Sequence, residues 1–136
     1  ITLELAGDGV MTGSDALIYR MIFNLTENAI KYNRPDGSVQ VCITQEPEKL
    51  LILVSDTGRG IPEEYQQSIF QPFFRVDKSR SRTFGGAGLG LALVWEIAAL
   101  HGGFVRVAES SDSGTTIAAE LPRSGNHAAA PKNETL

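Results

Sequence analysis

The pattern of apolar and polar residues divides the chain into strands and helices. Apolar residues alternate with polar ones in four segments, as in half-buried strands, and a continuous apolar run at residues 50–54 is typical of a central strand. Elsewhere apolar residues recur every three or four positions, which predicts amphipathic helices. The predicted strands are residues 1–5, 39–43, 50–54, 104–109 and 115–121, and the predicted helices are residues 15–32, 62–69 and 88–100.

The order of these elements predicts the fold class. Sequential strands joined by hairpins, together with helices, favour an α+β two-layer sandwich over a doubly wound parallel sheet. The first strand is short and alternating, and we expect it at an edge of the sheet. From residue 123 onward the residues are polar and small. The sequence therefore predicts one domain, residues 1–122, followed by a disordered tail, residues 123–136.

The first long helix carries a polar stripe beside its apolar one. Asn24, Asn28 and Lys31 recur at helical spacing, about 120° around the helix from the apolar face. An amide oxygen can ligate Mg²⁺, and an ammonium group can meet a phosphate. The alternative is an ordinary solvated face. The expected apolar face consists of Ile18, Ile22, Leu25 and Ala29.

A carboxylate follows the predicted central strand, in the run Asp56-Thr57-Gly58-Arg59-Gly60. A carboxylate accepts hydrogen bonds, so Asp56 could bind an exposed amino group such as that of adenine. Gly58 and Gly60 would let a flat ring approach the backbone without a Cβ collision. The alternative interpretation is an Asp-Gly turn without a ligand.

A glycine run at residues 85–90 opens directly into the second long helix. Free N–H groups at a helix N-terminus form an anion site, and glycine permits close approach of a phosphate. Just before it, residues 75–82 hold four cations and one acid, in a chain whose net charge is −4. This segment is either a lid that meets a polyphosphate or a solvated surface loop.

Composition excludes several other functions. The net charge of −4 argues against nucleic acid as a partner. Cys42 is the only cysteine, so neither disulfides nor a cysteine-based metal site is expected. No apolar run reaches the ~18 residues that span a bilayer. His101, at the end of a predicted helix, is interpreted as structural, with a partly charged ring favoured by the helix dipole. The P-loop pattern and a Ser/His/Asp arrangement are absent from the sequence.

Four motifs in fixed order resemble the catalytic, ATP-binding domain of bacterial sensor histidine kinases. The resemblance covers residues 1–122 and extends to a superfamily with DNA gyrase, heat-shock chaperones and mismatch-repair ATPases. It implies a Bergerat-type fold: a mixed, mostly antiparallel sheet with three helices on one face and a mobile ATP lid over residues 74–86. The motifs resemble the N box, the first glycine box, the F box and the second glycine box, at Asn24…Asn28-Ala29-Ile30-Lys31-Tyr32, Asp56-Thr57-Gly58-Arg59-Gly60-Ile61-Pro62, Phe70…Phe73-Phe74-Arg75 and Gly86-Ala87-Gly88-Leu89-Gly90-Leu91.

The resemblance implies roles for individual residues. Asn28 would ligate Mg²⁺, with Asn24 assisting one turn earlier. Asp56 would bind the adenine amino group. The remaining implied contacts are Lys31 and Arg75 to phosphate, Tyr32 beside the nucleotide, Gly58, Gly60 and Ile61 around the adenine pocket, and Gly86, Gly88, Leu89 and Gly90 in the phosphate-binding turn.

Two positions depart from the family pattern. Ala87 stands where the family often has threonine, and we expect a modest loss of phosphate affinity. Asn24 stands where the hydrolysing members carry a glutamate base, so hydrolysis should be slow and the γ-phosphoryl group should await another acceptor. The resemblance implies that this acceptor is a histidine on a separate dimerisation domain. Neither His101 nor His127 has a suitable helical context.

The resemblance also implies partners and a location. The partners would be ATP, the dimerisation domain of a homodimeric parent protein and a response regulator, and this part alone would be a soluble monomer. It would be a cytoplasmic domain of a parent anchored in the bacterial membrane. Two alternatives stay open: an anti-sigma-type serine kinase of the same fold, and a degenerate nucleotide-binding module that serves only as an interaction platform.

Overall fold

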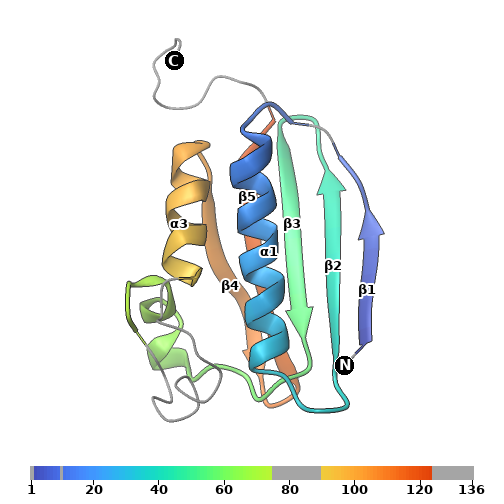
Figure 1. Ribbon diagram of the computed structural model, residues 1–136, viewed down its shortest axis with the longest axis vertical. Helices are drawn as coiled ribbons and strands as arrows, with labels where there is room; N and C mark the ends of the chain where they lie inside the picture. Colours follow the sequence, from blue (N-terminus) through green and yellow to red (C-terminus); the bar gives the residue numbers. More distant parts are fainter. Residues whose placement is uncertain (1, 10, 75–89, 124–136) are drawn as a thin grey trace.

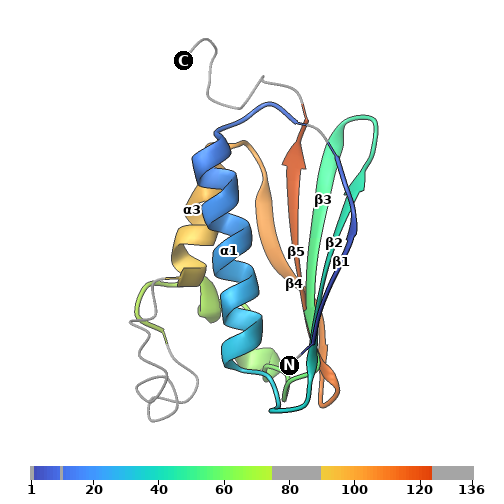
Figure 2. The ribbon, with the colours of Figure 1, turned by 45° about the vertical axis from the view of Figure 1, so that its right-hand side comes forward.

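The computed structural model describes residues 2–9, 11–74 and 90–123. These residues form two layers, a five-stranded sheet and a layer of helices on one of its faces (Figures 1 and 2). The strand order is β1-β2-β3-β5-β4. The strands are β1 (Thr2–Gly7), β2 (Ser38–Gln45), β3 (Lys49–Asp56), β4 (Phe104–Ser111) and β5 (Gly114–Pro122).

The pairing of the strands confirms the mixed, mostly antiparallel sheet. β1 lies at an edge and pairs with β2 in parallel, whereas the other three pairs are antiparallel. β3 is the middle strand, as its continuous apolar run predicted. The register between β4 and β5 shifts between Val107 and Glu109, and such a bulge re-aims the side chains that follow it.

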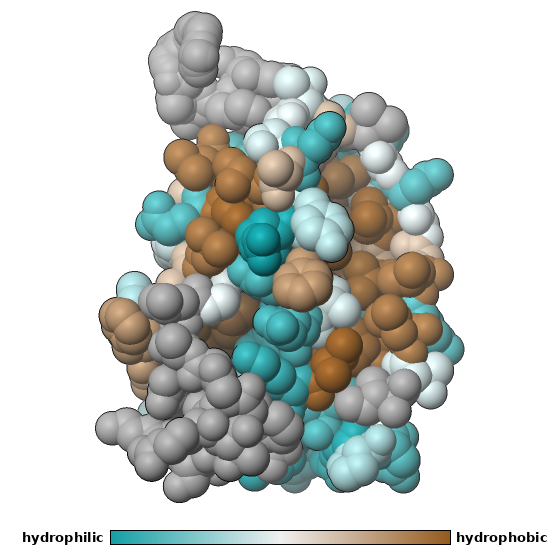
Figure 3. All heavy atoms as spheres, in the orientation of Figure 1, coloured by the Kyte–Doolittle hydropathy of each residue, from teal (hydrophilic) through white to brown (hydrophobic). Residues whose placement is uncertain are grey.

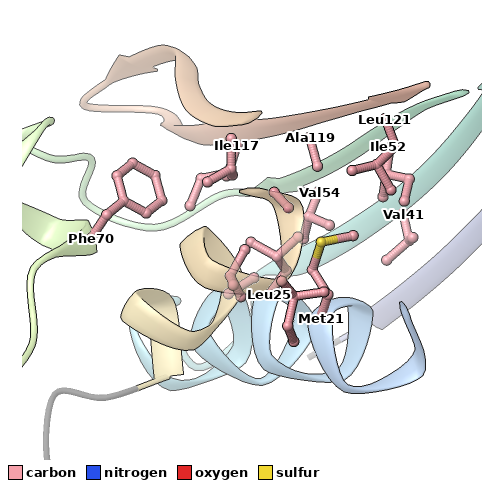
Figure 4. Packing of buried hydrophobic residues seen from close by; sticks show 14 of the residues in the cluster. Met21, Leu25, Val41, Ile52, Val54, Phe70, Ile117, Ala119 and Leu121 are labelled. Atoms are coloured by element: carbon pink, nitrogen blue, oxygen red, sulfur yellow. The ribbon is translucent and has the colours of Figure 1, made fainter. Parts of the chain in front are cut away.

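Helix α1 (Asp15–Lys31) packs over the middle of the sheet (Figure 1). Its start is capped by Ser14, whose hydroxyl accepts a hydrogen bond from the Leu17 N–H. Its buried side chains are Met21, Leu25 and Ala29. Figure 4 shows Met21 and Leu25 pointing at the apolar side chains of the sheet, among them Val41, Ile52, Val54 and Ala119.

The apolar face of α1 is therefore rotated from the predicted one. Leu25 and Ala29 are buried as expected, but Met21 takes the central position, and Ile18 and Ile22 are only half-buried at the edge of the core. The reason is that α1 lies over β2 and β3 and leaves the edge strand β1 uncovered. Leu5 on β1 is 74% exposed.

Helix α3 (Gly90–Leu100) lies beside α1 and ends at a buried histidine. His101 Nδ1 lies 2.8 Å from the Ile97 carbonyl oxygen, and Nε2 lies 3.1 Å from the Ser14 backbone nitrogen. Because a backbone N–H can only donate, Nε2 accepts and Nδ1 carries the proton. The structural role is confirmed. The ring ties α3 to the start of α1 through both of its nitrogens.

The predicted helix at residues 62–69 is replaced by two short 3₁₀ helices, η1 (Glu63–Tyr65) and η2 (Ser68–Phe70). A segment of this length is marginal as an α-helix, so tertiary contacts decide its conformation. Both Ile69 and Phe70 are buried, and the Phe70 ring lies 5.5 Å from that of Trp95 on α3. These core contacts, rather than local helix propensity, hold the segment in its observed conformation.

The surface of the helix layer is mixed. Figure 3 shows a polar stripe along α1 with apolar surface on both sides of it, over α3 and over β1–β2. Large apolar side chains with substantial exposure include Leu5, Leu93 and Leu100. Within the described ranges, no helix is both long and apolar enough to cross a membrane.

Candidate functional site

Three chain segments meet at one end of the sandwich: the last turns of α1, the end of β3 and the first turn of α3 (Figure 1). Side chains from all three, together with β5 and the η1–η2 segment, line a single pocket. The segments come from distant parts of the chain, and only the fold brings them together. The lining residues are Asn28, Tyr32, Asp56, Arg59, Gly60, Ile61, Ile69, Phe74, Leu91, Thr115 and Ile117.

Asp56 ends β3 at the wall of this pocket, and its two carboxylate oxygens differ. Oδ1 accepts hydrogen bonds from the backbone N–H groups of Gly58 (2.8 Å) and Thr115 (3.3 Å). No group in the described part of the chain hydrogen-bonds Oδ2. Partial burial raises the pKa of Asp56, and the two backbone N–H groups partly oppose this shift. Asp56 is thus a fixed acceptor with one oxygen available for a ligand.

The turn after Asp56 packs tightly against the end of α1. A Cβ added at Gly58 would lie 2.5 Å from the Tyr32 carbonyl oxygen, so only glycine fits at this position. Tyr32 itself lines the pocket. On the other side of the turn, the Ile61 N–H donates to Ser110 Oγ at 2.7 Å, which fixes Gly60 and Ile61 at the pocket wall.

The polar stripe of α1 reaches the pocket in part. Asn28 lines the pocket, and within the described ranges no hydrogen bond engages its carboxamide. Asn24, one turn earlier, donates from Nδ2 to the Gly90 carbonyl oxygen at 3.4 Å and so joins α1 to the start of α3. Lys31 is the last residue of α1 and is half-buried outside the lining. The structure therefore places Asn28 at the pocket, joins Asn24 to the start of α3, and leaves Lys31 outside the lining.

The predicted phosphate-binding residues are only partly covered by the structure. Gly90 opens α3, and Leu91 after it lines the pocket. The mouth of the helix therefore borders the same site as Asn28 and Asp56. Arg75, Gly86, Gly88 and Leu89, together with the predicted lid, lie outside the described residues.

Sequence reasoning missed several residues of the pocket. Thr115 is 5% exposed, lines the pocket and donates its N–H to Asp56. Its hydroxyl lies 2.8 Å from Ser110 Oγ, just beyond the β4 bulge. Arg59 and Phe74, which stood in the predicted motifs without an assigned role, also line the pocket. Thr115 pairs with Asp56 across β3 and β5, and this register could not be known before the strand order was known.

The fold is that of a histidine kinase-type ATPase domain, and comparison with known proteins identifies the family. Residues 13–125 match the model described as "Histidine kinase-, DNA gyrase B-, and HSP90-like ATPase". The chain belongs to this family.

Within the family, the similar proteins are sensor histidine kinases. The chain is 37% identical over 117 residues to sensor histidine kinase RppB of Synechocystis, covering 86% of this chain and 26% of that protein. It is 40% identical over 107 residues to sensor histidine kinase WalK of Bacillus subtilis, covering 77% of this chain and 18% of that protein. The chain thus spans about a quarter or less of these relatives. The predicted histidine kinase catalytic domain is confirmed.

Solved structures agree with this assignment. Mycobacterial sensor histidine kinase MprB matches with a TM-score of 0.78 and 31% identity, over 89% of this chain and 82% of that chain. Full-length ShkA in complex with AMPPNP matches with a TM-score of 0.76 and 26% identity, over 89% of this chain and 25% of that chain. These matches confirm the fold class.

Proposed function

We propose that this domain binds Mg-ATP and donates the γ-phosphoryl group to a histidine on a separate dimerisation domain of its parent protein. The observation that carries the proposal is the single pocket shared by Asn28, Asp56 and Leu91, which are widely separated in the sequence. The ShkA structure, solved with AMPPNP, supports a nucleotide as the ligand. We further infer that residues 1–122 are the catalytic domain.

The adenine half of the site consists of Asp56 and its surroundings. Asp56 Oδ2 accepts a hydrogen bond from the adenine amino group, because Oδ1 is already held by two backbone N–H groups. Ile61, Ile69 and Ile117 provide apolar surface for the base. A carboxylate that needs no reorientation before binding loses little free energy on complex formation.

The phosphate half lies at Asn28 and the mouth of α3. The carboxamide oxygen of Asn28 is a hard ligand of the kind Mg²⁺ prefers, and it borders the pocket without an internal hydrogen bond from the described residues. Bound Mg²⁺ would neutralise charge on the phosphates. Lys31 and Arg75 would add positive charge, and Gly86, Gly88, Leu89 and Gly90 would present backbone N–H groups.

Phosphoryl transfer rather than hydrolysis follows from the residue at position 24. Asn24 carries an amide, which cannot take a proton from water, and its Nδ2 is engaged by the Gly90 carbonyl. ATP bound here therefore waits for the phosphoacceptor histidine, and catalysis consists of positioning and charge neutralisation. We infer that the parent is a membrane-anchored homodimer whose cognate partner is a response regulator, with this domain in the cytoplasm.

Incubation of the isolated chain with γ-labelled ATP tests this assignment. The chain should bind nucleotide but acquire no stoichiometric label, because His101 is buried and engaged on both ring nitrogens. Stoichiometric label that stays on this chain alone would contradict the proposed role of a separate acceptor domain. The His101→Gln variant would show whether such label resides on that ring.

A further inference from the structure

A buried polar cluster lies just past the end of α1, outside the nucleotide pocket. Asn33 is 6% exposed, and its carboxamide is used on both sides. Nδ2 donates to the Ser38 carbonyl oxygen at 2.8 Å, while Oδ1 accepts from the Thr57 hydroxyl and from the Arg34 N–H, each at 2.8 Å. The Thr57 hydroxyl in turn accepts from the Ser38 N–H at 2.9 Å. We call Asn33, Thr57 and the Ser38 backbone the α1–β3 tie.

The α1–β3 tie lies directly behind the pocket. Asn33 directly follows Tyr32, and Thr57 directly follows Asp56. Both of those preceding residues line the pocket, whereas neither Asn33 nor Thr57 does. The tie therefore connects two walls of the pocket from outside its lining. One wall is the end of α1, which carries Asn28, and the other is the end of β3, which carries Asp56.

A second contact supports the same turn from the other side. The Arg34 guanidinium donates to the Asp112 carbonyl oxygen in the turn between β4 and β5, and lies 3.5 Å from the Gly58 carbonyl oxygen. The N–H of Thr115, from the same hairpin, donates to Asp56. The turn after Asp56 is thus held between the end of α1 and the β4–β5 hairpin.

We propose that Asn33 and Thr57 are positioning residues that set the adenine preference of the pocket by fixing the Asp56 turn against the end of α1. The inference rests on the proposed nucleotide function. Its physical basis is that partially buried hydrogen bonds restrict motion, and a polar group left unpaired weakens its neighbours. Without the Thr57 hydroxyl, the Ser38 N–H loses its acceptor and Asn33 Oδ1 loses one donor. The turn after Asp56 then loses its side-chain bond to the residue that follows Tyr32, and only the Gly58 and Thr115 N–H groups still hold Asp56 Oδ1.

Nucleotide binding by the Thr57→Val variant tests the proposal. This substitution removes the hydroxyl and keeps the size of the side chain. Dissociation constants for non-hydrolysable ATP and GTP analogues are measured by calorimetry at 10 °C, where circular dichroism establishes that each variant is folded. We expect the preference for ATP over GTP to fall by about tenfold in Thr57→Val and to return to within about twofold of wild type in Thr57→Ser.

The matched control is Thr116→Val. Its hydroxyl is likewise engaged in a partially buried bond, 2.8 Å long, to Ser55, but on the sheet face away from the helices. Thr116→Val should keep the wild-type preference for ATP over GTP. A Thr57→Val protein that is folded and keeps the wild-type preference, or loses both nucleotides equally, overturns the proposal. Absence of nucleotide binding by the wild-type chain would instead refute the proposed function itself.

Hydrogen exchange on the wild-type chain tests the tie without any substitution. The Ser38 amide donates to Thr57, and Ser38 does not line the pocket. Binding of the ATP analogue should slow exchange of this amide several-fold more than that of the Glu46 amide, which donates to Lys49 at the far end of the β2–β3 hairpin. Equal slowing of the two amides overturns the proposal even if Thr57→Val cannot be purified in folded form.

Discussion

At the residue scale, the two oxygens of Asp56 have separate tasks. Oδ1 maintains the turn through two backbone N–H groups, and Oδ2 is left for the ligand. This division explains why a carboxylate is suited to the position. An amide could satisfy the turn with its oxygen, but it would then present an NH₂ donor to the pocket.

Asp56→Asn should therefore change the choice of base more than the fold. The variant faces the adenine amino group with a second donor, so we expect ATP affinity to fall roughly 10- to 100-fold. Guanine presents a carbonyl oxygen at the corresponding position, and its affinity should fall less. Calorimetric titration with both analogues measures this change, and equal losses for ATP and GTP would show that Asp56 is only a turn residue.

The same carboxylate should influence stability as a function of pH. Burial raises its pKa above the ordinary value of 3.8, so the native state holds this proton more tightly than the unfolded chain does. As pH rises from about 3.8 through the raised native pKa, the unfolded chain releases its proton first, and the native state loses stability relative to it.

Urea unfolding of the nucleotide-free protein at several pH values measures this loss. Asp56→Asn lacks this ionisation. Its free energy of unfolding should therefore rise relative to that of the wild type across this pH window, and the difference should persist at neutral pH. A difference between the two proteins that does not vary with pH would contradict the assignment. The variant should thus bind ATP poorly while folding at least as well.

At the element scale, the strands and the two long helices could be predicted because their periodicity is complete within each segment. Ser14 and the apolar period of α1 are local signals, and so is the continuous run of β3. The η1–η2 segment could not be predicted, because its conformation depends on the contact of Phe70 with Trp95 across the fold. The motif residues Asn28 and Asp56 were predictable, but Thr115 was not, since its role comes from strand register.

The turn between β4 and β5 shows how one element shapes the site from a distance. Gly114 has φ +140°, and a Cβ there would lie 1.8 Å from the Asp56 carbonyl oxygen. Gly114→Ala should therefore lower the free energy of unfolding by about 2–3 kcal/mol. Among the described residues, a Cβ at Gly90, the first residue of α3, meets no atom within 4 Å beyond its chain neighbours and its own helix backbone, so Gly90→Ala should be neutral or stabilising by up to about 1 kcal/mol. Urea unfolding compares the two, and equal effects would contradict this account of the turn.

At the scale of the whole molecule, the sandwich works as a scaffold with its chemistry at one end. The core joins α1 to the central strands, and His101 ties α3 to α1 at the opposite end from the pocket (Figure 1). These contacts fix the relative positions of the helix that carries Asn28 and the strand that carries Asp56. The resemblance predicted this convergence, and the described residues confirm it for Asn28, Asp56 and the start of α3.

Calorimetric titration of the wild-type chain with a non-hydrolysable ATP analogue, with and without Mg²⁺, tests the central claim most directly. Two single variants on α1 accompany it: Asn28→Ala, and Glu27→Ala as the exposed neighbouring control. We predict that Mg²⁺ strengthens binding of the analogue to the wild type and to Glu27→Ala. In folded Asn28→Ala, the factor by which Mg²⁺ strengthens binding should be smaller by at least about tenfold. Binding that ignores Mg²⁺, or a full Mg²⁺ effect in Asn28→Ala, would contradict the claim that this end of the sandwich is a Mg-ATP site.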